Sequence, residues 1–197
     1  MRMQSSISVL VASCALAFSA PSHAADPGVQ RAAAPRAIKD FELTDQSGKP
    51  RKFSSFQGAP VLVFFGFTNC PDVCPTAMQQ LRSLMLTKDP AVLHAQVVMI
   101  SVDGARDTPA AMKAYLEPLS KKFVGLTGAP LKVRDIAAQF PAVFFKGTAD
   151  KAGGYRVDHT TQIYLVDAAG KLRASFTNAS VQSMSRTTAE ISRSPDT

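Results

Sequence analysis

Short apolar runs alternate with helix-periodic stripes along the first half of the chain. Residues 61–65 (VLVFF) are all apolar and rich in β-branched and aromatic types, which is typical of a short strand covered on both faces. Apolar residues then recur at helical spacing over residues 75–87, and residues 96–102 form a second apolar strand. A Thr-Pro pair begins another helix at residue 109. This order predicts a right-handed βαβ crossover with parallel strands.

The second half of the chain has shorter segments separated by Gly-containing turns. The predicted elements, in chain order, are a turn at 126–128, a helix over 130–139, a strand over 142–146, its hairpin partner at 155–157, core strands over 161–167 and 171–176, and a weak terminal helix over 181–192. A βαβ unit followed by a hairpin and a helix is the order of the thioredoxin fold. We therefore predict an α/β protein with a thioredoxin-like fold. Its central mixed sheet is flanked by helices, and a helix and β-hairpin insertion precedes the last two strands.

The N-terminus has the pattern of a targeting segment. Arg2 precedes a small, apolar run over residues 7–20, and Ser22-His23-Ala24 ends in small residues, so residues 1–24 are predicted to be a secretory signal peptide. Cys14 follows Val-Ala-Ser, which loosely imitates a lipoprotein box, so a lipidated or retained N-terminus is the alternative. Residues 25–38 are rich in Ala and Pro and predict a flexible lead-in. Residues 39–197 are the predicted thioredoxin-like domain.

The charge pattern limits the class of partner. The net charge is +7, but the basic residues are dispersed, without an aromatic-interleaved patch or a basic helix. This distribution argues against nucleic acid binding. It is compatible with an exported protein that contacts acidic partners or touches a membrane only peripherally.

Two cysteines, Cys70 and Cys74, lie on the loop between the central strand and its helix, each followed by a proline. Pro75 fits the first helical position, so Cys74 is expected at or beside the helix cap, where the helix dipole favours thiolate over thiol. A purely structural disulfide here would close a five-residue loop, worth only about 2 kcal/mol in the chain-entropy model. The pair is therefore predicted to do chemistry.

A histidine is expected beside the two thiols. In thioredoxin-like proteins a cis-proline usually begins the strand that faces the Cys loop, but this chain has no proline between residues 142 and 194. The strand start instead reads Val-Asp-His-Thr, so His159 takes that place. Asp158 is a candidate for orienting the ring. The other downstream histidine, His94, has no such placement and is predicted to be a solvated loop residue.

Two thiolates and an imidazole form a soft, three-coordinate set of ligands. Thiolates select Cu(I), and imidazole keeps Cu(II) accessible. Zinc would need a fourth ligand, for which Asp72 or Asp158 is the candidate. Thiol redox chemistry also stays open, although three residues separate the cysteines where the familiar redox motif has two.

Four blocks of the sequence resemble the Sco/SenC family of copper proteins in cytochrome oxidase assembly. They are FGFTNCPDVCPT (65–76), SVDGARDTPAAMKAYL (101–116), FVGLTG (123–128) and YRVDHTTQIYLVDAAGK (155–171). The resemblance implies a thioredoxin-like fold and one copper ion bound by Cys70, Cys74 and His159. It implies no metal role for residues 106–109, which are expected to form a loop and helix cap. Gly104 and Ala105 depart from the family pattern, as does the cleavable N-terminus.

The resulting hypothesis is an exported, periplasmic copper metallochaperone, either free or associated with the inner membrane. It would take copper from a donor protein and deliver it to an acceptor, an oxidase subunit. The alternative is a thiol–disulfide oxidoreductase, with Cys70 and Cys74 as the redox-active residues, acting on the oxidase copper-site cysteines or in periplasmic redox homeostasis with a thiol reductant as partner. The first is a chaperone function and the second an enzymatic one, and the sequence leaves both open.

Overall fold

A computed structural model describes residues 26–149 and 154–194. Its centre is strand β4 (Val61–Gly66), all of whose residues are buried. Strand β5 (Gln96–Ser101) pairs with β4 in parallel, and β6 (Val124–Thr127) pairs in parallel with β5. The connections are helices α1 (Val73–Met85) and α2 (Pro90–Leu93), then α3 (Pro109–Leu116). The predicted parallel βαβ unit is therefore confirmed.

Antiparallel strands complete the main sheet on both sides. Strand β9 (Ile163–Val166) pairs with β4 and with β10 (Lys171–Phe176). On the far side, β2 (Glu42–Asp45) pairs with β6 and with β3 (Pro50–Lys52), which leads into a short 3₁₀ helix, η1 (Phe53–Phe56). With β1 (Val29–Ala37) at one edge, the strand order is β1-β10-β9-β4-β5-β6-β2-β3. The sheet is mixed, as predicted.

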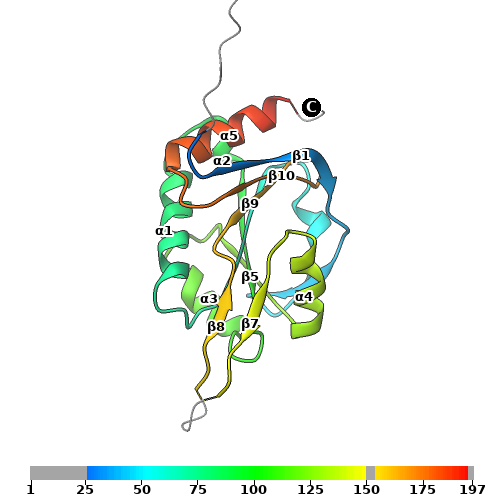
Figure 1. Cartoon of the computed structure of the whole chain (residues 1–197), viewed down its shortest axis with the longest axis vertical. Helices are drawn as coiled ribbons and strands as arrows, with labels where there is room; N and C mark the ends of the chain where they lie inside the picture. Colours follow the sequence, from blue (N-terminus) through cyan, green and yellow to red (C-terminus); the bar gives the residue numbers. More distant parts are fainter. Residues whose placement is uncertain (1–25, 150–153, 195–197) are drawn as a thin grey trace, which may run out of the picture.

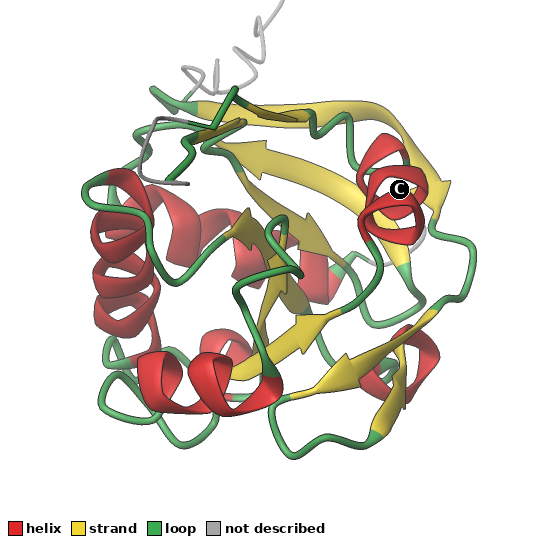
Figure 2. Cartoon of the chain, turned by 90° about the horizontal axis from the view of Figure 1, so that it is seen from below, coloured by secondary structure: helices red, strands yellow, loops and turns green. Residues whose placement is uncertain are grey.

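Helices lie on both sides of this sheet. Helix α1 contacts α2 and the C-terminal helix α5 (Val181–Arg193), and α3 packs against β6. Helix α4 (Pro130–Ala138) lies on the opposite side from α1 (Figure 1). Seen from below, the strands run between helices on either side (Figure 2). Because both faces are covered, the central strands consist of continuous apolar runs.

The predicted insertion is present between β6 and β9. It consists of α4 and a separate two-stranded sheet, in which β7 (Phe144–Lys146) pairs with β8 (Val157–His159). The hairpin partner lies slightly later in the chain than the expected residues 155–157, so His159 itself belongs to the strand and faces Phe144 in the register. The hairpin extends away from the main sheet, at the bottom of Figure 1.

Two predictions of secondary structure were wrong. The expected turn at 126–128 overlaps strand β6, whose Gly125 lies so close to Met112 and Leu116 of α3 that a β-carbon there would meet both side chains at 2.8 Å. The expected flexible lead-in at 25–38 contains strand β1 (Val29–Ala37), which pairs with β10. Its side chains are mostly exposed, so the strand is held by backbone pairing and leaves no apolar period in the sequence.

The predicted signal peptide, including Cys14, lies outside the described residues. Within residues 26–149 and 154–194, no helix combines the length and apolar character that crossing a membrane requires.

The attachment of β1 to the sheet can be tested at Gly28. This residue has φ +77°, and an added β-carbon would lie 2.3 Å from the Thr177 carbonyl oxygen. Gly28→Ala should lower the free energy of unfolding by about 2–4 kcal/mol, through left-handed strain and steric overlap. Gly48→Ala is the matched control, because Gly48 has φ +80° but open space around it, and its cost should be about 1 kcal/mol. Urea unfolding measures both, and equal costs would mean that β1 is not docked.

Candidate metal centre

The two cysteines lie where β4 leads into α1. Cys70 is on the connecting loop and is 8% exposed, whereas Cys74 is the second residue of α1 and is fully buried. The backbone N–H of Cys74 points at Cys70 Sγ, 3.4 Å away. A helix N-terminus has N–H groups without intrahelical partners, and here one of them faces the sulfur one turn earlier. Pro75 is the third helical residue instead of the first, still within the turn where a missing N–H costs nothing.

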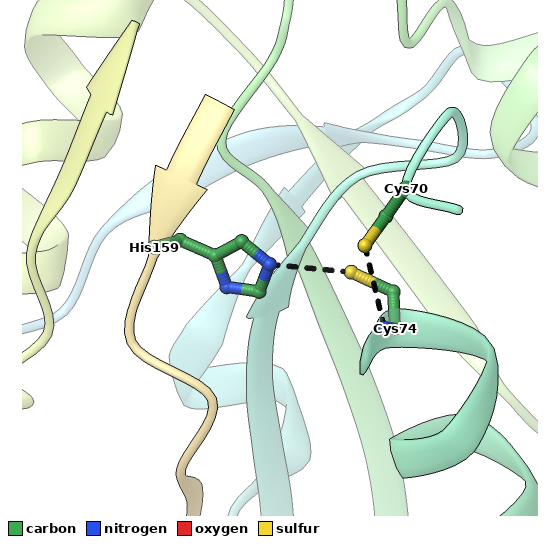
Figure 3. Close-up of side chains that lie close together, drawn as sticks. All are labelled: Cys70, Cys74 and His159. Atoms are coloured by element: carbon green, nitrogen blue, oxygen red, sulfur yellow. Dashed lines mark hydrogen bonds between the residues drawn. The ribbon is translucent and has the colours of Figure 1, made fainter. Parts of the chain in front are cut away.

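His159 approaches the cysteines from β8. Its Nδ1–H donates to the carbonyl oxygen of Thr160 at 2.8 Å, and Nε2 lies 3.4 Å from Cys74 Sγ (Figure 3). Because a carbonyl only accepts hydrogen bonds, the proton of the neutral ring is on Nδ1. The Nε2 lone pair therefore faces the sulfur, which is the tautomer that a metal-binding imidazole needs.

The three side chains predicted from the sequence come together. The Sγ atoms of Cys70 and Cys74 and the ring nitrogen of His159 lie within 4.8 Å of one another, so one ion would be within reach of all three. Both thiols are free. The rings of Phe64 and Phe67 pack edge-on against the imidazole, with centroids 5.9 and 5.7 Å away. These apolar walls hold the ring in position and reduce access of water.

Burial controls the protonation of this cluster. It raises the pKa of the Cys74 thiol well above its ordinary value, and the neighbouring Cys70 sulfur adds to the effect. It also lowers the pKa of His159. Burial therefore opposes the Cys74 thiolate that the helix end was expected to favour. A cation that binds here must displace thiol protons.

Comparison with known proteins identifies the fold and the family. The SCO1/SenC family model matches residues 29–194. The chain belongs to the SCO1/SenC family. An SCO2-like protein of Rickettsia conorii is 36% identical over 138 residues, which are 70% of this chain and 67% of that protein. The mitochondrial SCO2 homologue of Danio rerio is 40% identical over 133 residues, 66% of this chain and 48% of the relative, so the match spans about half of that protein.

Solved structures agree with the family assignment. The crystal structure of Arabidopsis thaliana ScoI with copper bound superimposes with a TM-score of 0.72 at 28% identity, covering 80% of this chain and 99% of that one. The predicted thioredoxin-like fold and the resemblance to Sco/SenC proteins are thus both confirmed.

The carboxylates considered as ligands or orienting groups take other places. Asp158 is exposed on β8, and the Nδ1 hydrogen bond of His159 goes to the backbone carbonyl of Thr160, so an orienting role of Asp158 stays a prediction. Asp72 is exposed at the N-cap of α1. Neither aspartate belongs to the group of clustered ligand atoms. The fourth ligand that zinc would need is not supplied by these two residues.

This SCO1/SenC protein also uses a buried carboxylate that sequence reasoning treated as loop structure. Asp107 is fully buried and accepts hydrogen bonds from Thr68 N–H (3.1 Å), Thr68 Oγ1 (2.6 Å) and Ser101 Oγ (2.7 Å). Thr68 lies two residues before Cys70, so Asp107 ties the Cys loop to the end of β5. The adjacent Thr108 caps α3 by accepting from Ala111 N–H, as expected.

The loop between β5 and α3, which contains Asp107, also holds the hairpin that carries His159. Tyr155 Oη donates to Asp103 Oδ1 at 2.6 Å, and Arg106 pairs with the other oxygen of Asp103. The Arg106 guanidinium stacks over the Tyr155 ring at 3.9 Å and lies 5.8 Å from the centre of the Phe67 ring. The available signal was the position of these charged residues directly after a buried parallel strand, where α/β proteins place binding sites.

The half-buried imidazole should make stability depend on pH. The pKa of His159 is lowered from an ordinary value of 6.5, so below that value the unfolded chain binds a proton that the folded chain does not. Stability should fall as the pH falls from 7 toward 5, by at most about 1.4 kcal/mol per unit from this group. Unfolding of the reduced, metal-free protein measures this slope. His159→Gln should flatten it and His94→Gln, at an exposed site, should not. Equal slopes in wild type and His159→Gln would contradict the assignment.

The Asp107 anchor predicts a coupled loss of stability and of thiol protection. Asp107→Asn removes the charge from three hydrogen bonds, which should lower the free energy of unfolding by about 2 kcal/mol. Cys70 should also react faster with a thiol reagent under native conditions, because the loop is released. Asp135→Asn, at an exposed position on α4, serves as the control. Destabilisation with unchanged labelling would show that Asp107 does not hold the Cys loop.

Proposed function

We propose that this protein is a copper metallochaperone that binds one copper ion through Cys70 Sγ, Cys74 Sγ and His159 Nε2. The observation that carries the proposal is the convergence of these ligand atoms within 4.8 Å of one another, with the Nε2 lone pair already turned toward Cys74. Membership of the SCO1/SenC family supports it, as do the copper-bound structures of the Arabidopsis and yeast relatives.

The chemistry of the ligand set favours copper over other ions. Two thiolates bind Cu(I) strongly, and the imidazole also suits Cu(II). When copper enters, the two thiols lose their protons and the neutral imidazole contributes its free lone pair, so binding releases protons. Three ligands leave the ion under-coordinated. An acceptor thiolate can therefore attach before a chaperone thiolate leaves, and the ion moves by ligand exchange without being released into water.

The acceptor that we propose is the copper site of a respiratory oxidase subunit, and the copper donor is a second protein partner. The proposed location is the periplasm or another exported compartment, with the chain at most peripherally associated with the inner membrane. We infer a role in oxidase assembly from the family membership. One relative of solved structure, BsSco, is described as a member of the Sco family of cytochrome c oxidase assembly proteins.

A second candidate function uses the same thiols as a redox pair. Cys70 and Cys74 are free and their sulfurs belong to one cluster. In this reaction one thiolate attacks a partner's disulfide and the second resolves the mixed disulfide. Cys70 and Cys74 become a disulfide while the partner gains two electrons and two protons as two thiols. Because joined sulfurs cannot hold copper, the two activities alternate. A disulfide switch is described for the relative BsSco.

Competition for Cu(I) tests the main proposal. The purified, reduced protein is titrated against a chromophoric Cu(I) chelator, and one copper per chain should bind. His159→Ala should weaken the affinity at least about tenfold, and Cys70→Ser should weaken it further because a thiolate is lost. His94→Ala is the control, since this imidazole is exposed and lies outside the cluster.

An equal Cu(I) affinity in the wild type and His159→Ala, or no competitive Cu(I) binding at all, would contradict the chaperone function. The reduction potential of the Cys70–Cys74 pair and its exchange with a model disulfide would then decide on the redox function, which should survive in His159→Ala.

A further inference from the structure

A groove with mainly apolar walls lies between α4 and the hairpin that carries His159. Figure 1 shows α4 and β7 side by side, and the groove between them has a volume of about 570 Å³. Its walls are formed by Arg134 and Ala138 of α4 and by residues 141–145. Half of the large apolar side chains that are exposed in the described part of the chain belong to these two segments, namely Leu131, Val143 and Phe145. Such a concentration of exposed apolar side chains indicates an interaction surface.

Backbone hydrogen bonds show which groups of β7 face β8. Thr160 N–H donates to the Val143 carbonyl oxygen at 3.0 Å. Further along the hairpin, Gly147 N–H donates to the Arg156 carbonyl oxygen at 2.9 Å. In an antiparallel pair, every second residue of a strand bonds to the partner strand. With the observed register, the residues that bond across the hairpin from the β7 side are Val143, Phe145 and Gly147.

The backbone groups of Phe144 and Lys146 therefore point away from β8. No residue of β8 lines the groove, so this free edge of β7 lies on the groove side of the hairpin. An edge with unpaired N–H and C=O groups can pair with an extended segment of another chain. Lipid offers backbone groups no hydrogen bonds. The edge thus favours a polypeptide over a membrane as the occupant of the groove.

Arg134 gives this surface a preference for a negatively charged partner. It is the only charged side chain among the residues that line the groove. It is exposed, and it takes part in none of the ion pairs between described residues; nor does its neighbour Asp135. A guanidinium in this position can bind a carboxylate of the occupant through two parallel hydrogen bonds.

We propose that the free edge of β7 and the groove beside α4 form the docking site for the copper acceptor. The acceptor would add an extended segment as a third strand of the hairpin sheet, with apolar side chains against Phe145 and a carboxylate on Arg134. Because neighbouring strands are about 4.8 Å apart, the added strand would lie about 10 Å from β8. Docking would thus bring the acceptor close to His159, as ligand exchange requires. This inference deepens the proposed function and rests on it for the identity of the partner.

Two substitutions at Lys146 test the pairing of the edge. Both remove the ammonium group that lies 3.7 Å from the centre of the Tyr155 ring. Only Lys146→Pro also removes an N–H from the free edge and obstructs an added strand, and it leaves the bonds within the hairpin in place. Copper transfer from the loaded protein to the reduced, copper-free copper domain of the oxidase subunit should be at least about tenfold slower for Lys146→Pro than for Lys146→Ala. Equal Cu(I) affinities of the two variants show that the strand of His159 is intact.

The apolar part of the surface is tested without changing the backbone. Phe145→Ser should slow the same transfer about tenfold, because a large exposed side chain is lost from the contact. Leu93→Ser is the control, since Leu93 is 45% exposed on α2, and its transfer rate should match that of the wild type. Hydrogen exchange supplies a direct readout of strand addition. The acceptor domain should protect the amides of Phe144 and Lys146, whereas the Phe145 amide, already bonded to β8, should change little.

The other outcomes overturn the inference in different ways. If the wild type transfers copper and Phe145→Ser transfers it equally fast, the docking site is wrong and the chaperone function stands. If Phe145→Ser is slow but the amides of Phe144 and Lys146 gain no protection, no strand is added at this edge. Normal transfer, together with Phe145-dependent binding to phosphatidylethanolamine–phosphatidylglycerol vesicles or with Phe145-dependent dimers in sedimentation, would assign the surface to lipid or to a second copy. If the wild type binds no copper or transfers none, the proposed function fails and the docking site fails with it.

Discussion

The site depends on one buried carboxylate, that of Asp107. Burying a charged carboxylate away from water is costly unless hydrogen-bond donors surround it. Here Thr68 and Ser101 supply those donors from two different segments. This requirement fixes the Cys loop against the end of β5. The neighbouring Asp103 repeats the arrangement with Tyr155 and thereby fixes the hairpin. Segments that are distant in sequence therefore meet at one loop, and the cysteines and the histidine are held at metal-binding distance through it.

Burial favours the uncharged forms of two of the three ligands when no metal is bound. The pKa of Cys74 is raised and that of His159 is lowered. Gly66 makes this packing possible, because a β-carbon at that position would lie 3.0 Å from Cys74 Sγ and 2.5 Å from the Phe64 ring. A buried Cys74 thiol that must lose its proton before it can bind copper couples copper uptake to proton release.

Sequence reasoning succeeded where side chains carry the signal. The apolar run of β4 and the Cys-Pro pattern before α1 predicted the strand, the helix and the loop between them, and the fold order then placed His159 beside the thiols. It failed where backbone groups do the work. Strand β1 is held by pairing with β10 while its side chains stay exposed, and the His159 ring is oriented by the Thr160 carbonyl. The role of Asp107 was also hidden, because its partner Thr68 is 39 residues away.

The cysteine spacing and the histidine reinforce each other chemically. With three residues between them, the cysteines are one helical turn apart, which lets the Cys74 N–H face the Cys70 sulfur while Cys74 Sγ faces the imidazole. A proline at position 159 would offer no side-chain donor to a metal, whereas histidine offers a lone pair aimed at the sulfur. A thioredoxin-like scaffold that otherwise supports disulfide exchange thus gains a third ligand at the point where its two thiols meet. The fold places residue 159 beside the two thiols, and the identity of that residue decides whether a metal has a third ligand.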